Sequence, residues 1–141
     1  MLAYFSCGYT FLICDNERMI PFLQKKIGGL RNAIKGVTVV WHEHNFRFEV
    51  VWAVLTLLFA WLLDFSVMEF SIVILMIGLV LAAETVNTAL EELCDKFQPT
   101  HDPHIERIKD LGAAAVLVSS AAALAVGLIL FIPRLIIFFS A

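Results

Sequence analysis

Three long apolar runs constrain the fold of this chain more than any other feature of its sequence. They cover roughly residues 48–63, 70–93 and 111–132. Because a helix rises about 1.5 Å per residue and the hydrocarbon core of a bilayer is about 30 Å thick, the second and third runs are long enough to cross it. The first run is short and needs its flanking residues, with Trp52 and Trp61 suited to the interfacial regions. Hydrophobic residues make up 60% of the 141 residues, against about 45–50% in soluble domains. We therefore expect an all-α membrane protein with three transmembrane helices.

Basic residues give the expected orientation of these helices. Only Arg134 follows the third run, and the short turn at residues 64–69 holds no Lys or Arg. Every other Lys and Arg precedes the first run or lies between the second and the third. Since cytoplasmic loops carry an excess of Lys and Arg, we expect the N-terminus and the loop over residues 94–110 to face the cytoplasm.

The segment before the first run divides into two parts. Residues 1–20 form a poorly defined N-terminal extension, and Met19 is a plausible alternative start. Residues 21–41 predict an amphipathic helix with one apolar stripe and a basic remainder, suited to an anionic membrane surface. The stripe consists of Ile27, Leu30, Ile34, Val37 and Trp41. An equally open alternative is that this helix packs against the other helices of the chain. At the other end, residues 133–141 are expected to form a short tail.

Small residues are frequent in the third run, at positions 112–115 and 119–123. Small side chains let helix backbones approach closely, which favours helix association within lipid. Three helices enclose little interior, so we expect a homo-oligomer.

A polar stripe crosses the end of the second apolar run. Asn87, Thr88, Glu91 and Asp95 project within about 60° of Glu84 on a helix. Glu84 lies roughly 13 Å inside the end of the run. An acidic group at the centre of a membrane helix costs about 2.5–3.5 kcal/mol on insertion scales, so it is expected to face a partner, a cavity or a substrate. A structural hydrogen bond between helices is the alternative for Glu84 alone.

A second polar cluster precedes the first run. Glu43 and Arg47 have the i, i+4 spacing of a helical salt bridge, which is the simple explanation for that pair. His42 and His44 alternate without a further ligand, which is a weak signal for metal, so both are first placed at the surface.

The loop before the third run holds the last cluster. His101, Asp102 and His104 suggest metal binding, but a solvated turn broken by Pro103 is the more economical account. Lys109 stands where the third run begins. There it could neutralise a phosphate or pair with an acidic residue of the polar stripe, Glu91 or Asp95.

Together these clusters place carboxylates from two elements and a lysine from a third at one membrane surface. Carboxylates suit Mg²⁺, a lysine suits phosphate, and a carboxyl in apolar surroundings suits a general base. The sequence has no G-x-x-x-x-G-K-[ST] loop and no H-R-D or D-F-G set. The residues alone therefore indicate metal or phosphate chemistry at a membrane interface.

Three motifs in this order resemble the small prokaryotic diacylglycerol kinase family, which includes undecaprenol kinases. They are E-H-N-F-R-F-E at residues 43–49, E-x-x-N-[ST]-x-x-E at residues 84–91, and K-D-x-x-x-A-A-V-L at residues 109–117. The resemblance covers residues 21–132 and implies a membrane lipid kinase domain there. It implies an amphipathic surface helix, three membrane helices, and a homotrimer in the bacterial inner membrane with sites shared between subunits.

The resemblance also implies a role for each site residue. Glu84 would be the general base that takes the proton from the lipid hydroxyl, and Glu43 and Glu91 would hold the metal ions on the ATP phosphates. The other positions follow from the same match. Lys109 and Asp110 are expected to bind the nucleotide. Four more residues are assigned to ATP because they fall where members of the family contact nucleotide or lipid: Lys25, Asn32, His101 and Asp102. Those expected to line the site are Asn87, Asp95 and Glu49.

The expected activity is ATP- and Mg²⁺-dependent phosphorylation of a membrane lipid hydroxyl, with no nucleic-acid partner. Glu49 slightly favours diacylglycerol as the acceptor, because undecaprenol-type members often carry His there. Asn45 and the His-Asp-Pro-His loop at residues 101–104 lean towards undecaprenol. Two other classes stay open at this point. One is a non-catalytic transport subunit in which Glu84 is an ion or proton site, and the other is a lipid phosphatase, for which the chain lacks a convincing nucleophile motif.

Overall fold

The computed structural model describes residues 26–98 and 100–140, and almost all of them are helical, with no strand among them. A helix covers residues 26–40. It is followed by α2 (His44–Leu62), α3 (Val67–Phe97) and α4 (Pro103–Ser140). The chain forms two compact units, one ending at Val39 and one beginning at Val40. The all-α fold expected from the sequence is confirmed.

The helix over residues 26–40 has the amphipathic pattern expected from its sequence. The side chains of Ile27, Leu30, Ile34 and Val37 are all more than half exposed. An exposed apolar stripe needs another surface to cover it, so a membrane surface stays the predicted site for this helix. The expected extension over residues 1–20, and Lys25 with it, lie outside the described residues.

Three of the described helices are long and apolar enough to cross a membrane. They have 19, 31 and 38 residues, which correspond to lengths of about 28, 46 and 57 Å. The first apolar run was expected to need its flanking residues, and α2 meets that need by beginning at His44. These helices confirm the prediction of three helices that can span a membrane.

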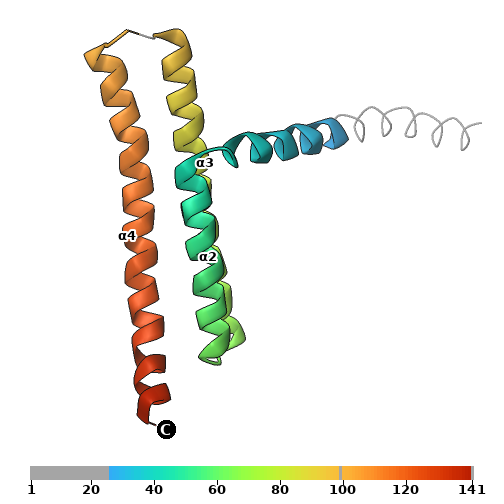
Figure 1. The fold of residues 1–141 in the computed structure, drawn as a ribbon, viewed down its shortest axis with the longest axis vertical. Coiled ribbons are helices and arrows are strands. Elements are labelled where there is room, and N and C mark those ends of the chain that lie inside the picture. The colour runs from blue at the N-terminus through green and yellow to red at the C-terminus, as the bar shows by residue number, and fades with distance from the viewer. Residues whose placement is uncertain (1–25, 99, 141) are drawn as a thin grey trace, which may run out of the picture. The chain divides into compact units, whose positions relative to one another are not determined.

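Within the second unit, α3 packs against both α2 and α4, as Figure 1 shows. Few of its side chains are buried, and several of those are small or polar: Ala60, Glu84, Asn87 and Ser119. Most large apolar side chains on all three helices are exposed, as expected for helices that face lipid or other subunits.

The turn between α2 and α3 is held by polar contacts to the far end of α4. Ser66 and Glu69 form a capping box that begins α3. Arg134 donates two hydrogen bonds to the Glu69 carboxylate, at 2.6 and 3.2 Å, and one to the carbonyl of Asp64 at 3.2 Å. The rings of Phe65 and Phe131 pack against each other beside these contacts, with their centroids 4.6 Å apart. These contacts fix the end of α4 against the turn.

Pro103 has a different role from the one that the sequence suggested. Pro103 was expected to break a solvated turn, but it is the first residue of α4. Proline is well tolerated there because its missing N–H would have no helical partner. Asp102 accepts hydrogen bonds from the backbone N–H groups of His104 and Ile105 at 2.7 and 3.3 Å, which caps the helix. At the other end α4 continues through Pro133 to Ser140, so the segment expected as a tail is helical as far as Ser140.

Candidate active site on the polar face of α3

The polar stripe predicted on the second span lies along one face of α3, with Glu84 and Asn87 buried, Glu91 half-buried and Asp95 exposed. Glu84 and Asn87, one turn apart, are only 4% and 6% exposed. The amide nitrogen of Asn87 donates a hydrogen bond to Glu91 Oε1 at 3.0 Å, one turn further along. Because α3 ends at Phe97, Glu84 lies about 20 Å from that end along the helix axis. The face therefore carries a carboxyl that is deep in the helix and enclosed by its neighbours.

Carboxylates from the start of α2 join this face. Glu43 and Glu91 both lie close enough to Glu84 to interact with it electrostatically, and so does Glu49. Asn45 hydrogen-bonds to the Glu84 carboxyl through its side chain. Two helices thus bring four acidic side chains to one place, as the positions of the motifs in the sequence suggested.

Among the described residues, no hydrogen bond or ion pair uses the Glu43 carboxylate. It is the N-cap residue of α2, but its side chain makes no capping hydrogen bond. Arg47 interacts with the ring of His44, at 3.0 Å from Nη2 to Nδ1. Within the described part of the chain there is no Glu43–Arg47 ion pair, so the simple salt-bridge reading of that spacing is wrong.

Glu49 lies between the acidic cluster and an apolar groove. Its Oε2 atom is buried and has no hydrogen-bond partner. The groove has a volume of about 730 Å³ and runs along α2, α3 and α4, from Phe48 and Trp52 to Leu135. Glu49 is one of the few polar groups on its wall.

Lys109 reaches the same end of the bundle from α4. Its ammonium lies 2.8 Å from Asp95 Oδ1, so of the two partners considered from the sequence, Asp95 is the one that it contacts. The Asp95 side chain is 67% exposed and that of Lys109 35%. The pair is accordingly open to water, and Asp110 beside it is also exposed.

The other described residues expected at the nucleotide are His101, Asp102 and Asn32, the last of which belongs to the first compact unit. His101 faces Glu106 at 3.8 Å, and the Asp102 carboxylate caps α4. Asn32 is exposed on the helix over residues 26–40. For these three residues the assignment to ATP stays a prediction.

Comparison with known proteins decides which family has this arrangement. A sequence model of the family described as prokaryotic diacylglycerol kinase matches residues 31–131, most of the chain. The chain belongs to this family. Among curated relatives, the undecaprenol kinase of Bacillus subtilis (strain 168) is 34% identical over 93 residues, which are 66% of this chain and 76% of the relative. The diacylglycerol kinase of Escherichia coli (strain K12) is 33% identical over 86 residues, 60% of this chain and 70% of the relative.

Membership of the diacylglycerol kinase family makes this protein a lipid kinase, and ATP is the phosphoryl donor that the family implies. With its three apolar helices it is a multi-pass membrane protein. The resemblance seen in the three motifs is thus confirmed, and the readings as a transport subunit or a phosphatase are set aside.

The acidic face of this kinase carries carboxylates, which are among the ligands that Mg²⁺ prefers. Glu43, Glu84, Glu49 and Glu91 lie near one another, and none forms an ion pair with a basic side chain in the described part of the chain. Like charges so arranged favour a bound cation. The described residues hold no group of three or more His, Cys, Asp or Glu that could bind a metal by itself. Mg²⁺ typically takes one or two carboxylates and completes its shell with phosphate oxygens and water, so a metal site shared with a nucleotide stays a prediction.

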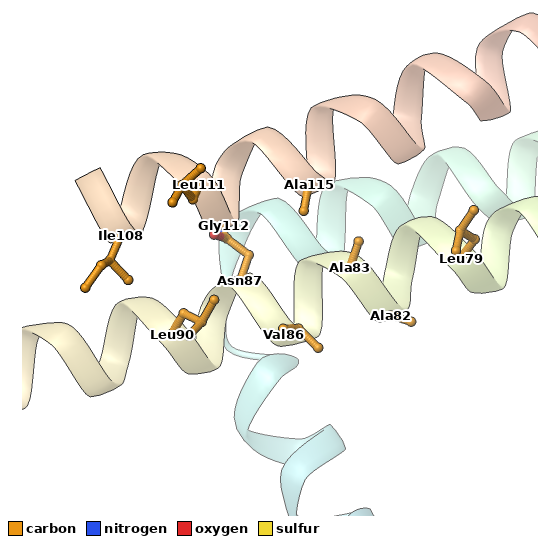
Figure 2. Close-up of a pocket in the computed structure, with 10 residues that line it drawn as sticks. All are labelled: Leu79, Ala82, Ala83, Val86, Asn87, Leu90, Ile108, Leu111, Gly112 and Ala115. Atoms are coloured by element: carbon orange, nitrogen blue, oxygen red, sulfur yellow. The ribbon is translucent and has the colours of Figure 1, made fainter. Parts of the chain in front are cut away.

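Two residues that contact this face from other helices were not assigned a role from the sequence. Asn45 had been noted only in connection with the acceptor, and its contact with Glu84 depends on how α2 meets α3. Gly112 had been noted only as a small residue. In Figure 2 the side chain of Asn87 points from α3 to Gly112 on α4. Residue spacing does not reveal either contact, because each joins residues on two different helices.

Proposed function

We propose that the protein transfers the γ-phosphate of ATP to the hydroxyl of a membrane lipid at the acidic face of α3, with Glu84 as the general base. The observation that carries this proposal is the buried Glu84 carboxyl with other carboxylates gathered around it. Phosphoryl transfer is mostly a matter of positioning and charge neutralisation. A base, a metal site and a cation for phosphate are therefore a sufficient set of groups.

The depth of Glu84 supports its role as the base. A lipid hydroxyl lies near the bilayer surface and does not leave the membrane, so its base must sit within the membrane-embedded part of the protein. Glu84 is enclosed, and Asn45 holds its carboxyl by a hydrogen bond. In this position one carboxylate oxygen accepts the proton from the attacking hydroxyl while Asn45 keeps the group oriented.

Glu43 and Glu91 are the proposed ligands for Mg²⁺. They come from different helices and both lie near Glu84. Glu91 is held by Asn87 at 3.0 Å, whereas Glu43 is exposed at the start of α2. When bound, Mg²⁺ would supply positive charge that neutralises the charge developing on the phosphate oxygens.

Lys109 and Asp110 are the proposed nucleotide contacts. Lys109 lies on the water-exposed side of the acidic face, where a soluble nucleotide can approach. Its ion pair with Asp95 holds the ammonium in place without burying it. A compact ammonium in that position provides a point charge for phosphate oxygens.

Diacylglycerol is the acceptor that Glu49 favours. Ester oxygens only accept hydrogen bonds, so the buried Oε2 of Glu49, which has no partner among the described residues, could pair with an ester of diacylglycerol by donating a hydrogen bond from the protonated carboxyl. The adjoining groove suits hydrocarbon chains. The alternative is undecaprenol, the substrate named for the Bacillus subtilis relative, which offers a hydroxyl and no second polar group.

We further propose that the protein acts as a homotrimer in the bacterial inner membrane, with its N-terminus and the loop before α4 in the cytoplasm. The exposed apolar side chains on all three spans support association with lipid or other subunits. The distribution of Lys and Arg supports the orientation.

The acceptor assay uses the full-length protein in detergent with ATP and Mg²⁺. Diacylglycerol and undecaprenol are offered separately at equal concentrations in mixed micelles, and the phosphorylated lipids are measured. We expect faster phosphorylation of diacylglycerol in the wild type, and a smaller preference in Glu49→His. Faster phosphorylation of undecaprenol would contradict the choice of acceptor. No phosphorylation of either lipid by the folded protein would contradict the proposed reaction.

A further inference from the structure

We propose that Gly112 is a positioning residue for the metal ligand Glu91 and acts through the amide of Asn87. This inference rests on the proposed function, since it takes Glu91 as a ligand for Mg²⁺. Gly112 lies on α4 and is buried. It belongs to neither the acidic cluster nor the nucleotide contacts.

The contact between Gly112 and Asn87 leaves no space for a side chain on α4. A Cβ atom at position 112 would lie 2.5 Å from Asn87 Oδ1 and 3.5 Å from both Asn87 Cγ and Leu90 Cδ1. Real Cβ atoms essentially never approach another heavy atom more closely than 3.0 Å. At the other described glycines, which are Gly28, Gly29, Gly36, Gly78 and Gly127, a Cβ would meet nothing within 4 Å.

The chemistry of the two partners fixes the orientation of the Asn87 amide. An ionised carboxylate only accepts hydrogen bonds, so the nitrogen of the amide must face Glu91, and it does so at 3.0 Å. The oxygen must then face α4. There Asn87 Oδ1 is buried and has no conventional hydrogen-bond partner among the described residues. The glycine hydrogen that occupies the Cβ direction points at this oxygen, which allows a weak C–H···O contact.

Gly112 and Glu91 therefore hold the Asn87 side chain from opposite sides. Alanine at position 112 would force the amide oxygen away, and the amide nitrogen would move with it because the group is planar. Glu91 would lose its hydrogen bond and could turn to other rotamers. Loss of a group that orients a metal ligand typically weakens metal binding by roughly 10–100-fold.

The first test compares metal binding in Gly112→Ala and in a matched control. Gly78→Ala makes the same change in α3 at a site with open space around it. Mn²⁺ is the probe, and its bound fraction is measured by electron paramagnetic resonance on full-length protein with a non-hydrolysable ATP analogue. We expect at least about tenfold weaker Mn²⁺ binding in Gly112→Ala and wild-type binding in Gly78→Ala. Wild-type binding in a folded Gly112→Ala variant would overturn the inference.

The second test asks whether Gly112 acts through Asn87. Asn87→Ala removes the amide, so adding Gly112→Ala to it should weaken Mn²⁺ binding no further. Equal and independent losses from the two changes would overturn the proposed route. If Gly112→Ala alone fails to fold, the double variant decides the question. It should fold and bind Mn²⁺ as Asn87→Ala does, whereas a double variant that also fails to fold would mean that the Cβ conflicts with something other than the amide.

Glu91→Gln separates this inference from the proposed function. If Glu91→Gln weakens Mn²⁺ binding and Gly112→Ala does not, the positioning role fails while the metal assignment stands. If Glu91→Gln leaves Mn²⁺ binding unchanged, the assignment of Glu91 fails, and the inference fails with it.

Discussion

Glu84→Gln should abolish most of the activity without unfolding the protein. Glutamine has nearly the same shape as glutamate and can still hydrogen-bond to Asn45, so the enclosed site should keep its packing. Glutamine cannot accept a proton from a lipid hydroxyl. The substitution also removes a charge from a place where Glu43 and Glu91 lie close by. The thermal stability of the variant should accordingly equal or exceed that of the wild type.

The size of the effect follows from the role of the group. Proton transfer by a positioned side chain contributes about 10²–10⁴-fold to a rate, which corresponds to about 2.7–5.4 kcal/mol of transition-state stabilisation at about 1.36 kcal/mol per tenfold. Because Glu84 is only 4% exposed, bulk water has little access to replace it as the base, and the loss should lie in the upper part of that range. The loss should fall on kcat, since the acceptor and the nucleotide still bind.

The assay measures initial rates at saturating ATP, Mg²⁺ and diacylglycerol, with unfolding followed on the same preparation. Glu92→Gln is the matched control because Glu92 is an exposed glutamate on the same helix, and it should keep the wild-type rate. A kcat for Glu84→Gln within tenfold of the wild type would refute the assignment of the base. A variant that loses activity only because it unfolds would refute the argument from packing.

Three further substitutions test other parts of the account. Glu91→Gln should raise the free Mg²⁺ concentration for half-maximal rate by roughly tenfold, measured by titration at fixed ATP, because it removes a metal ligand. Lys109→Met should raise the KM for ATP by roughly tenfold and change the KM for lipid little, because the ammonium beside Asp95 faces the nucleotide side. Arg134→Gln should lower the unfolding temperature by a few degrees and leave kcat unchanged, because its contacts to Glu69 lie at the opposite end of α3 from Glu91.

For each of these three predictions, a different result would contradict the expected role of the residue. An unchanged Mg²⁺ requirement in Glu91→Gln would remove that residue from the metal site. A rise in the KM for lipid with no change for ATP would place Lys109 at the acceptor instead. A fall in kcat for folded Arg134→Gln would mean that the turn between α2 and α3 is coupled to the site.

The sequence predicted those features that depend on one helix at a time. Helical periodicity alone placed Glu84, Asn87 and Glu91 on one face of the second span, and in the structure Glu84 and Asn87 are buried and Glu91 is half-buried. Run length and hydropathy predicted three spans, and three described helices meet both criteria. The ion pair between Lys109 and Asp95 could be anticipated because a short loop returns the chain from α3 to α4.

Features that depend on contacts between helices could not be predicted in this way. The packing of Asn87 on Gly112 is set by how closely α3 and α4 approach, which residue spacing does not reveal. The contact of Asn45 with Glu84 is likewise set by the position of α2 on α3. The role of Pro103 was also predicted wrongly, because the effect of a proline depends on its position in a helix. At the first position Pro103 begins α4, and Pro133 lies within a helix that continues to Ser140.

The central claim is that the acidic face of α3 is where a lipid receives phosphate from ATP. The most direct measurement follows the transfer of radiolabelled γ-phosphate from ATP to diacylglycerol by the purified wild type and by Glu84→Gln, with the labelled lipid isolated and counted. The account predicts labelled phosphatidic acid from the wild type and a signal lower by about 10²–10⁴-fold from the variant. Equal labelling by the two proteins would contradict it, because the lipid would then be phosphorylated without the buried carboxylate.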